Sequence, residues 1–319
     1  MLVILLPTSG MSQTECAYVT NFDSDFITVI GMASFEKIAD VKTGKNPHGV
    51  AVSPDGMFVA VSNEGDNSVS IVDPTTNTVV RTISVGSHPH QVAFTNDAAW
   101  LYVTINAEHS VAVINTTLWK VEASIPVGRN PHIVLPSPDG KTMYVTSEGD
   151  EKVSIIDLAS KRVVGEIPVF GFPRVMTITP DGKTMYLTMR WMNGALKIDI
   201  EKKSVIDWVQ LAPSPKFPSE GKASHGPGVS PDGKFLYITS QVLNSVTVVD
   251  IATGNIVQEI PVGNDPNWIG FSKGGKYAVV SNTGSSDVSI IDLILRKVVH
   301  NISVGKSPKR LAVGFVAAK

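Results

Sequence analysis

A fixed spacing of 42 residues runs through the chain and limits what it can fold into. Seven residues occupy the same point of the repeat, and six of them directly follow a proline. Successive members are 42 residues apart, except for one step of 51 between the fourth and the fifth. The seven residues are His48, His90, His132, Arg174, His225, Asn267 and Lys309.

Two other landmarks keep the same spacing. A tetrad of the type Tyr-Val-Thr-Asn begins at Tyr18 and returns in each repeat, with the same single step of 51. An acid or amide closes the following apolar run at Asp73, Asn115, Asp157, Asp199, Asp250 and Asp292. Three landmarks in phase indicate a true internal repeat and not a chance match.

The length of the repeat predicts the fold. Units of about 42 residues with short alternating apolar runs are typical of four-stranded propeller blades, which bury their faces only by stacking on neighbours. We therefore expect an all-β, seven-bladed β-propeller with four-stranded blades. In one unit the inner strand is expected at 50–53, the second at 58–63, the third at 68–73 and the outer one at 79–86, with the Pro-Asp-Gly turn after the first.

The ends of the chain fall at different points of the repeat. Residues 18–41 supply a second, a third and an outer strand, whereas residues 308–315 supply an inner strand with nothing after it. Pairing the two ends would complete the seventh blade and remove the open sheet edge. We expect this 3+1 closure within one propeller domain at 16–319.

The repeat resembles a known family. The tetrad, the segment PHGVAVSPDG, the strand SVSIVD and the ending IPVG look like the YVTN-family β-propeller repeat over nearly the whole chain. The resemblance implies kinship with surface-layer and cell-surface propellers, and with propeller domains of periplasmic redox enzymes such as nitrous oxide reductase. Because the repeat itself defines the family, the resemblance predicts the fold and leaves the function open.

Composition and the N-terminus restrict the setting. The chain of 319 residues has a net charge of −2, which gives no reason to expect nucleic acid, and it carries no transmembrane segment. Residues 1–15 have an apolar run followed by small and polar residues, which predicts a signal-peptide remnant or a disordered tail. The first interpretation places the protein in the periplasm or outside the cell. The single cysteine, Cys16, excludes an internal disulfide.

The seven in-phase residues form the candidate site, and we call them the mouth ring. Each precedes an inner strand, so all seven are expected around one mouth of the central tunnel. Arginine, lysine and histidine together favour a small polar or anionic ligand. A copper, zinc or iron ion is the alternative, with ligands drawn from His48, His88, His90, His132 and His225. A third interpretation gives these side chains only a structural role in filling the mouth.

The fourth blade departs from the repeat in two ways. Nine extra residues precede His225 in a proline-rich stretch at 212–224, which predicts a loop over the same mouth. Large apolar residues follow the blade's tetrad, where other units have polar ones. We expect Trp191, Met192 and Phe217 to contact a partner or form a lid, with a plain spacer loop as the alternative.

Two classes of function remain open. The first is an exported, non-catalytic binding or scaffold module for a protein or a small polar ligand, including a subunit of a periplasmic redox complex. The second is a metal- or cofactor-dependent, oxidoreductase-like protein with chemistry at the mouth ring. The sequence requires no cofactor and contains no nucleophile elbow, P-loop or HExxH motif, so it favours the first class.

Overall fold

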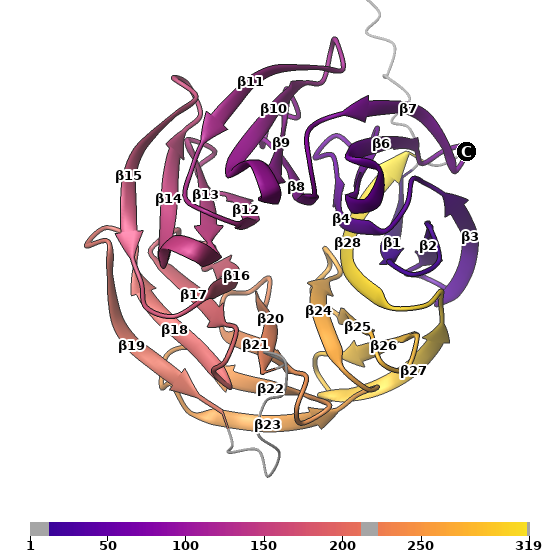
Figure 1. Cartoon of the computed structure of the whole chain (residues 1–319). Helices are drawn as coiled ribbons and strands as arrows, with labels where there is room; N and C mark the ends of the chain where they lie inside the picture. Colours follow the sequence, from indigo (N-terminus) through magenta and orange to yellow (C-terminus); the bar gives the residue numbers. More distant parts are fainter. Residues whose placement is uncertain (1–12, 212–222, 318–319) are drawn as a thin grey trace, which may run out of the picture.

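Seven four-stranded antiparallel sheets surround a central tunnel in a computed structural model that describes residues 13–211 and 223–317 (Figure 1). The inner strands are β4 (Pro47–Val52), β8 (Pro89–Phe94), β12 (Pro131–Pro136), β16 (Pro173–Ile178), β20 (Ser224–Val229), β24 (Pro266–Phe271) and β28 (Pro308–Ala317). The second strands are β5 (Val59–Asn63), β9 (Trp100–Ile105), β13 (Thr142–Ser147), β17 (Thr184–Met189), β21 (Phe235–Ser240), β25 (Tyr277–Asn282) and β1 (Gln13–Asn21). The predicted all-β, seven-bladed propeller is confirmed.

The other two strands of each blade lie farther from the tunnel. The third strands are β6 (Ser68–Asp73), β10 (Ser110–Asn115), β14 (Lys152–Asp157), β18 (Gly194–Asp199), β22 (Ser245–Asp250), β26 (Asp287–Asp292) and β2 (Phe26–Gly31). The outer strands are β7 (Thr78–Ser84), β11 (Lys120–Pro126), β15 (Arg162–Pro168), β19 (Ser204–Gln210), β23 (Ile256–Pro261), β27 (Lys297–Ser303) and β3 (Glu36–Lys42). Six third strands end at the predicted acid or amide.

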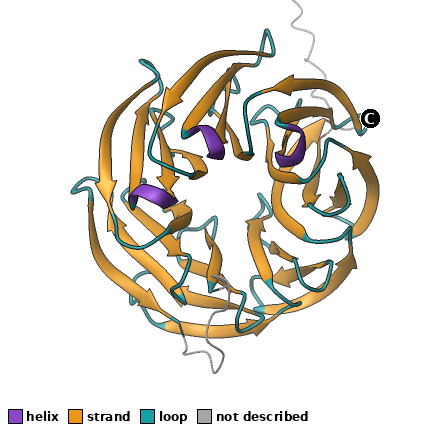
Figure 2. Cartoon of the chain, in the orientation of Figure 1, coloured by secondary structure: helices purple, strands orange, loops and turns teal. Residues whose placement is uncertain are grey.

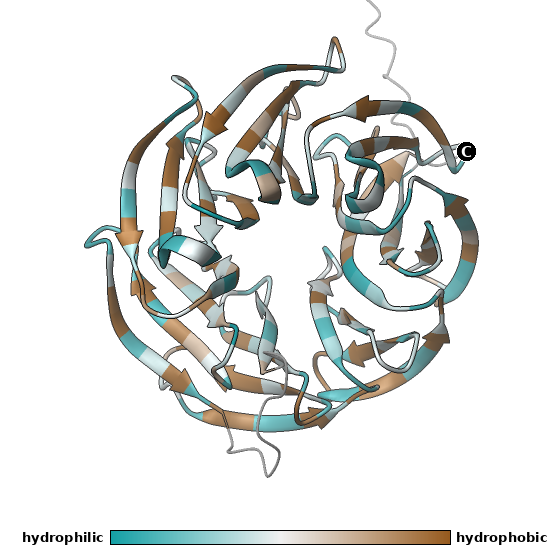
Figure 3. Cartoon of the chain, viewed as in Figure 1, coloured by the Kyte–Doolittle hydropathy of each residue, from teal (hydrophilic) through white to brown (hydrophobic). Residues whose placement is uncertain are grey.

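The hydrophobic core lies between neighbouring sheets. Each cluster of buried side chains joins two adjacent blades, as where Ile71 of β6 packs with Phe94 and Leu101 of the next blade. The second and third strands are buried on both faces because a blade covers each side. The outer strands are mostly exposed, with one buried residue such as Ile83 near the end of β7, and Figure 3 shows teal, hydrophilic residues along them. The ring of blades is therefore held together by burial of apolar surface at every blade-to-blade contact.

The two chain ends share one sheet, as the 3+1 closure predicts. Antiparallel pairing of β28 with β1 runs from Gln13 opposite Ala317 to Asn21 opposite Pro308, and Figure 1 shows the yellow β28 beside the indigo β1. The strand β1 begins at Gln13, so residues 13–15, assigned to the tail from the sequence, pair within the seventh blade. Residues 1–12 lie outside the described residues.

The inner strands begin earlier than expected. The first of them starts at Pro47 rather than at residue 50, so His48 is inside the strand and not in the segment before it. The turn after it has Gly56 at a φ of +73°, as the Pro-Asp-Gly sequence predicts. Three short 3₁₀ turns, η1 (Glu64–Asp66), η2 (Asn106–Glu108) and η3 (Glu148–Asp150), face the tunnel in Figure 2. In the described ranges no helix is long and apolar enough to cross a membrane.

Candidate functional site at the tunnel mouth

All seven mouth-ring residues line one cavity of about 580 Å³ at the mouth where the inner strands begin. Their imidazoles lie edge to face around it, with ring centroids 4.6 Å apart for His48 and His90 and 5.3 Å apart for His90 and His132. His225 continues the series at 6.2 Å from His132. The 42-residue spacing thus brings together side chains that are far apart in the chain.

The hydroxyl of each tetrad fixes the backbone beneath a mouth-ring residue of the next blade. In all seven repeats the Thr or Ser side chain donates a hydrogen bond to the carbonyl of that residue, at 2.5–3.4 Å. Thr146, for example, donates to the Arg174 carbonyl at 2.9 Å and accepts from the Ile133 amide at 3.1 Å. The tetrad is therefore an interblade clamp, and the ring stands on rigid strands rather than on loops.

A second set of residues faces the same cavity, and the sequence analysis missed it. The residue after each tetrad also recurs at the 42-residue step, and six of the seven line the cavity; we call the seven the acid ring, after its two glutamates. Its members are Phe22, Glu64, Asn106, Glu148, Arg190, Gln241 and Thr283, of which Thr283 does not line the cavity. The signal was present in the 42-residue register, but the sequence analysis did not follow the position after the tetrad.

The histidines of the mouth ring are held neutral. Burial lowers the pKa of His48, His132 and His225 well below 6.5, and the positive charges of Arg310 and Arg174 lower it further. Burial also lowers the pKa of His90, whereas Glu64 opposes that shift. The histidines therefore contribute no positive charge for an anionic ligand near neutral pH, and the arginines and lysine of the site must supply it.

A buried arginine contacts the wall of the cavity at His132. Arg310 is only 1% exposed, its Nη2 lies 3.2 Å from His132 Nε2 across the tunnel, and its guanidinium carbon is 4.6 Å from the centroid of the Trp268 ring. Burial, followed by the charge of Arg174, lowers the pKa of Arg310 to about 9, so it is still cationic at neutral pH. Its Nε and Nη1 atoms have no hydrogen-bond partner among the described residues.

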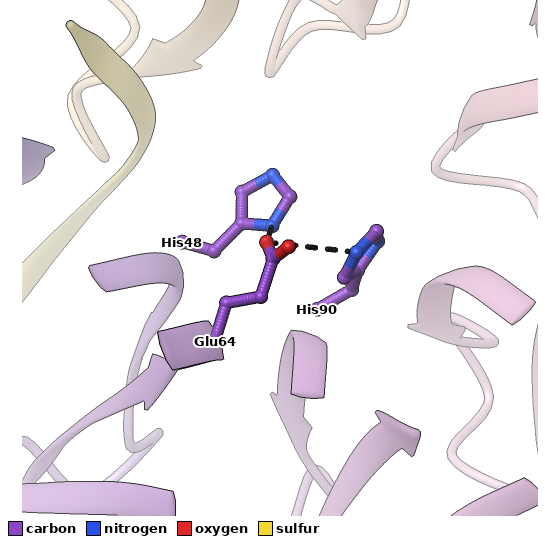
Figure 4. Close-up of side chains that lie close together, drawn as sticks. All are labelled: His48, Glu64 and His90. Carbon is purple, nitrogen blue, oxygen red and sulfur yellow. Dashed lines mark ion pairs between the residues drawn. The ribbon is translucent and has the colours of Figure 1, made fainter. Parts of the chain in front are cut away.

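Acids and bases are unevenly paired around the cavity. Glu148 holds Arg174 at 3.1 Å and Arg190 at 3.6 Å. Glu64 contacts three imidazoles: His48 at 2.8 Å, His88 at 3.4 Å and His90 at 3.6 Å. Figure 4 shows the Glu64 carboxylate between the His48 and His90 rings. Within 13–211 and 223–317 no lysine or arginine forms an ion pair with Glu64.

The candidate metal ligands divide into two groups. His48, Glu64 and His90 each offer one ligand atom, and these atoms lie within 4.8 Å of one another. His88 is on the exposed side of Glu64, with 61% of its side chain exposed. His132 and His225 face the cavity but are not members of the three-residue group.

The residues predicted to contact a partner or form a lid do not share one environment. Trp191 is 49% exposed, next to the Arg190 guanidinium at the cavity rim. Met192 packs against the apolar cluster of its own blade and its neighbour. Phe217 lies outside the described residues, as does the inserted stretch from 212 to 222. A partner or lid contact at Trp191 remains a prediction.

A second cavity, of about 840 Å³, opens at the other end of the inner strands. It shares no lining residue with the first, and apolar side chains such as Phe94, Phe271 and Leu311 line it. Trp268 packs against the apolar cluster of the blades β12–β15 and β16–β19.

Comparison with known families now identifies the chain. The model of the YNCE-like beta-propeller family matches residues 2–116 and 216–315, about two thirds of the sequence. The chain belongs to the YNCE-like beta-propeller family. This confirms the predicted kinship with YVTN-type propellers.

The individual proteins similar to this chain support its fold and give little information about its function. A curated protein of Mycobacterium tuberculosis, the PE-PGRS family protein PE_PGRS18, is 59% identical over 34 residues, which cover 11% of this chain and only 7% of that protein. Hydrazine synthase of Kuenenia stuttgartiensis superposes with a TM-score of 0.75 at 23% identity, over 85% of this chain and 95% of that one. The periplasmic gluconolactonase PpgL of Pseudomonas aeruginosa has a TM-score of 0.75 at 21% identity, over 95% and 99%.

Proposed function

We propose that this exported YNCE-like propeller binds a small organic anion, bearing a carboxylate or phosphate group, in the polar mouth of its tunnel. The observation that carries the proposal is Arg310, a buried cation with two guanidinium nitrogens unpartnered in the described structure. It contacts His132 in the wall of the cavity that Arg174 and Lys309 also line. The proposal makes the mouth ring a binding site and the blades its rigid support.

The charge balance supports an anionic ligand. Arg174, Arg190 and Lys309 line the cavity, and Arg310 contacts its wall at His132. Among the described residues that line the cavity, only two carboxylates, Glu64 and Glu148, face these four cations, while the buried imidazoles are neutral. A cation taken out of water without a counter-charge is costly, and a bound anion would reduce that cost. Burial and the neighbouring Arg310 lower the pKa of Lys309, which is the expected sign for cations gathered without enough anions.

The shape and polarity of the cavity favour a ligand the size of a sugar acid. About 580 Å³ is typical of small-molecule sites. Asn106, Asn130, Gln241 and Asn267 also line it, and amides can donate to and accept from hydroxyl groups. We therefore choose gluconate as the organic probe. The name of the structural neighbour PpgL, a periplasmic gluconolactonase, points to the same chemistry and is consistent with export.

Hydrolysis of a lactone is the second candidate function. A neutral imidazole beside a carboxylate, as in His48 and Glu64 at 2.8 Å, is the arrangement that general-base activation of water uses. The cationic wall could stabilise the oxyanion that forms when water attacks a lactone carbonyl. The measurement is glucono-δ-lactone hydrolysis above the spontaneous rate. Loss of that excess in His48→Asn, with gluconate binding retained, would favour this role over simple binding.

Isothermal titration calorimetry in the presence of EDTA tests the binding proposal. Gluconate and inorganic phosphate serve as anionic probes, and glucose serves as the neutral probe. We expect saturable binding of at least one anion, no binding of glucose, and at least tenfold weaker binding in Arg174→Gln.

The matched control is Arg81→Gln, which removes the same charge from the exposed outer strand β7. It should bind like the parent protein. Equal affinities in Arg174→Gln and Arg81→Gln, or no anion binding at all, would overturn the proposal.

A further inference from the structure

We infer that His48, Glu64 and His90 form a binding site for one divalent transition-metal ion, for which Zn²⁺ is the probe of choice. The site lies in the wall of the polar cavity, between the first two complete blades after the N-terminus. The inference goes beyond the proposed anion binding and does not require it.

The ligand atoms are already near the spacing that zinc requires. Glu64 Oε2 lies 2.8 Å from His48 Nδ1 and 3.6 Å from His90 Nε2, and one ligand atom from each residue fits within 4.8 Å of the others. Zinc bonds of about 2.0–2.2 Å in a tetrahedron separate ligand atoms by roughly 3.3 Å. Small side-chain rotations would therefore close the site around the ion.

The Nδ1 atom of His48 faces the carboxylate of the group without an aligned hydrogen bond in the described structure. His48 is 9% exposed, and its Nδ1 points at Glu64 Oε2. His90 Nδ1 is also without a hydrogen-bond partner in the described part of the chain. Buried polar atoms normally have a partner, so an unpartnered imidazole nitrogen facing a carboxylate suggests that the group is arranged for a ligand.

The repeat supplies an internal comparison. Glu148 occupies the same repeat position as Glu64, two blades farther along. Its carboxylate forms ion pairs with the guanidinium groups of Arg174 at 3.1 Å and Arg190 at 3.6 Å. At Glu64 the equivalent place is taken by the imidazoles of His48 and His90. Glu148 is therefore neutralised by arginines of the protein, whereas Glu64 has two side chains around it that can ligate a metal.

Two imidazoles and one carboxylate suit Zn²⁺, whereas an all-oxygen site would suit calcium or magnesium. Three protein ligands would leave a fourth position for water or another ligand, and all three residues line the cavity. His88 contacts the other oxygen of Glu64 at 3.4 Å and would orient the carboxylate from the exposed side. Lys309 and Arg310 oppose a cation in this cavity, so the charge of Glu64 is essential to the site.

The test is titration of metal-free protein with Zn²⁺, followed calorimetrically, and with Co²⁺, followed by the visible bands of a tetrahedral cobalt site. No organic anion is present in either titration, so failure of the anion proposal would not affect the result. We expect one equivalent to bind, and at least 30-fold weaker binding in Glu64→Gln. Glu148→Gln is the matched control and should remain within threefold of the parent.

A second variant keeps the inference falsifiable if Glu64→Gln folds poorly. His90→Asn removes a ligand from the edge of the group and should also lose the cobalt bands, with far-UV circular dichroism as the check on folding. Absence of saturable binding, equal affinity in Glu64→Gln, or an equal loss in Glu148→Gln would overturn the inference.

Discussion

Mild acid should destabilise this propeller by an amount that the neutral histidines determine. His48, His90, His132 and His225 are buried, and burial lowers the pKa of each well below 6.5. In the unfolded chain their pKa returns to about 6.5. Below that pH the unfolded chain binds protons that the folded chain does not, so the free energy of unfolding falls as pH falls through 6.5.

The magnitude follows from linkage. At pH 5.5 each histidine that stays neutral in the folded state lowers the free energy of unfolding by up to about 1.4 kcal/mol, and four together by up to about 5.6 kcal/mol. That is comparable with the whole stability of a typical domain, about 5–15 kcal/mol. Most carboxyl groups titrate at lower pH, so they contribute little between pH 7.5 and 5.5.

Urea unfolding at pH 7.5 and 5.5 measures the effect, and single variants isolate it. His225→Asn keeps a donor for the Asn267 carbonyl, which His225 Nδ1 contacts at 2.8 Å, and removes one titrating group. We expect the difference in unfolding free energy between the two pH values to shrink by about 1 kcal/mol in this variant. Asn267→Ala, which removes a ring residue that does not titrate, should leave that difference unchanged. An unchanged difference in His225→Asn would refute the neutral-imidazole account.

Three other changes test the fold and the rim. Deleting residues 308–319 removes β28 and reopens the sheet edge at β1, so it should lower the thermal midpoint of the whole ring; an unchanged midpoint would contradict the closure. Thr146→Val removes a hydroxyl that bridges the Ile133 amide and the Arg174 carbonyl and should cost about 1–3 kcal/mol in urea unfolding, whereas a cost near zero would mean that the interblade clamp is dispensable. Joint substitution Trp191→Ser and Met192→Ser should reduce self-association or partner capture in sedimentation experiments; because Met192 packs on the apolar cluster, the Trp191→Ser single variant is the cleaner test, and wild-type behaviour there would assign the tryptophan no contact.

The fold was predictable because three features of the sequence recur at the same 42-residue spacing. The tetrad, the mouth ring and the acid at the end of the third strand keep one register, so blade number, strand order and closure all follow from spacing. The strand boundaries could not be predicted from this spacing. The inner strand begins at Pro47, although a proline and a glycine flank His48 and favour a turn there. A register shift between Pro47 and Val50 lets Pro47 pair with Asn63 of the same blade, which extends that strand beyond its apolar run.

The site was predictable only in part. The same register that placed His48 also placed Glu64, but turn residues and cavity-lining residues look alike in a sequence. Arg310 could not be found by periodicity, because the equivalent positions in other blades hold Gly49, Gln91 and Trp268 and have no common chemistry. Its contact with His132 depends on a long side chain that crosses the tunnel, and such a contact is a property of the closed ring.

A crystal structure of the protein grown with saturating gluconate would test the central claim most directly. The account predicts the gluconate carboxylate in the polar cavity, within hydrogen-bonding distance of at least one of Arg174, Lys309 and Arg310. Gluconate bound at the apolar mouth near Phe271, or a polar cavity that holds only water at saturation, would contradict it.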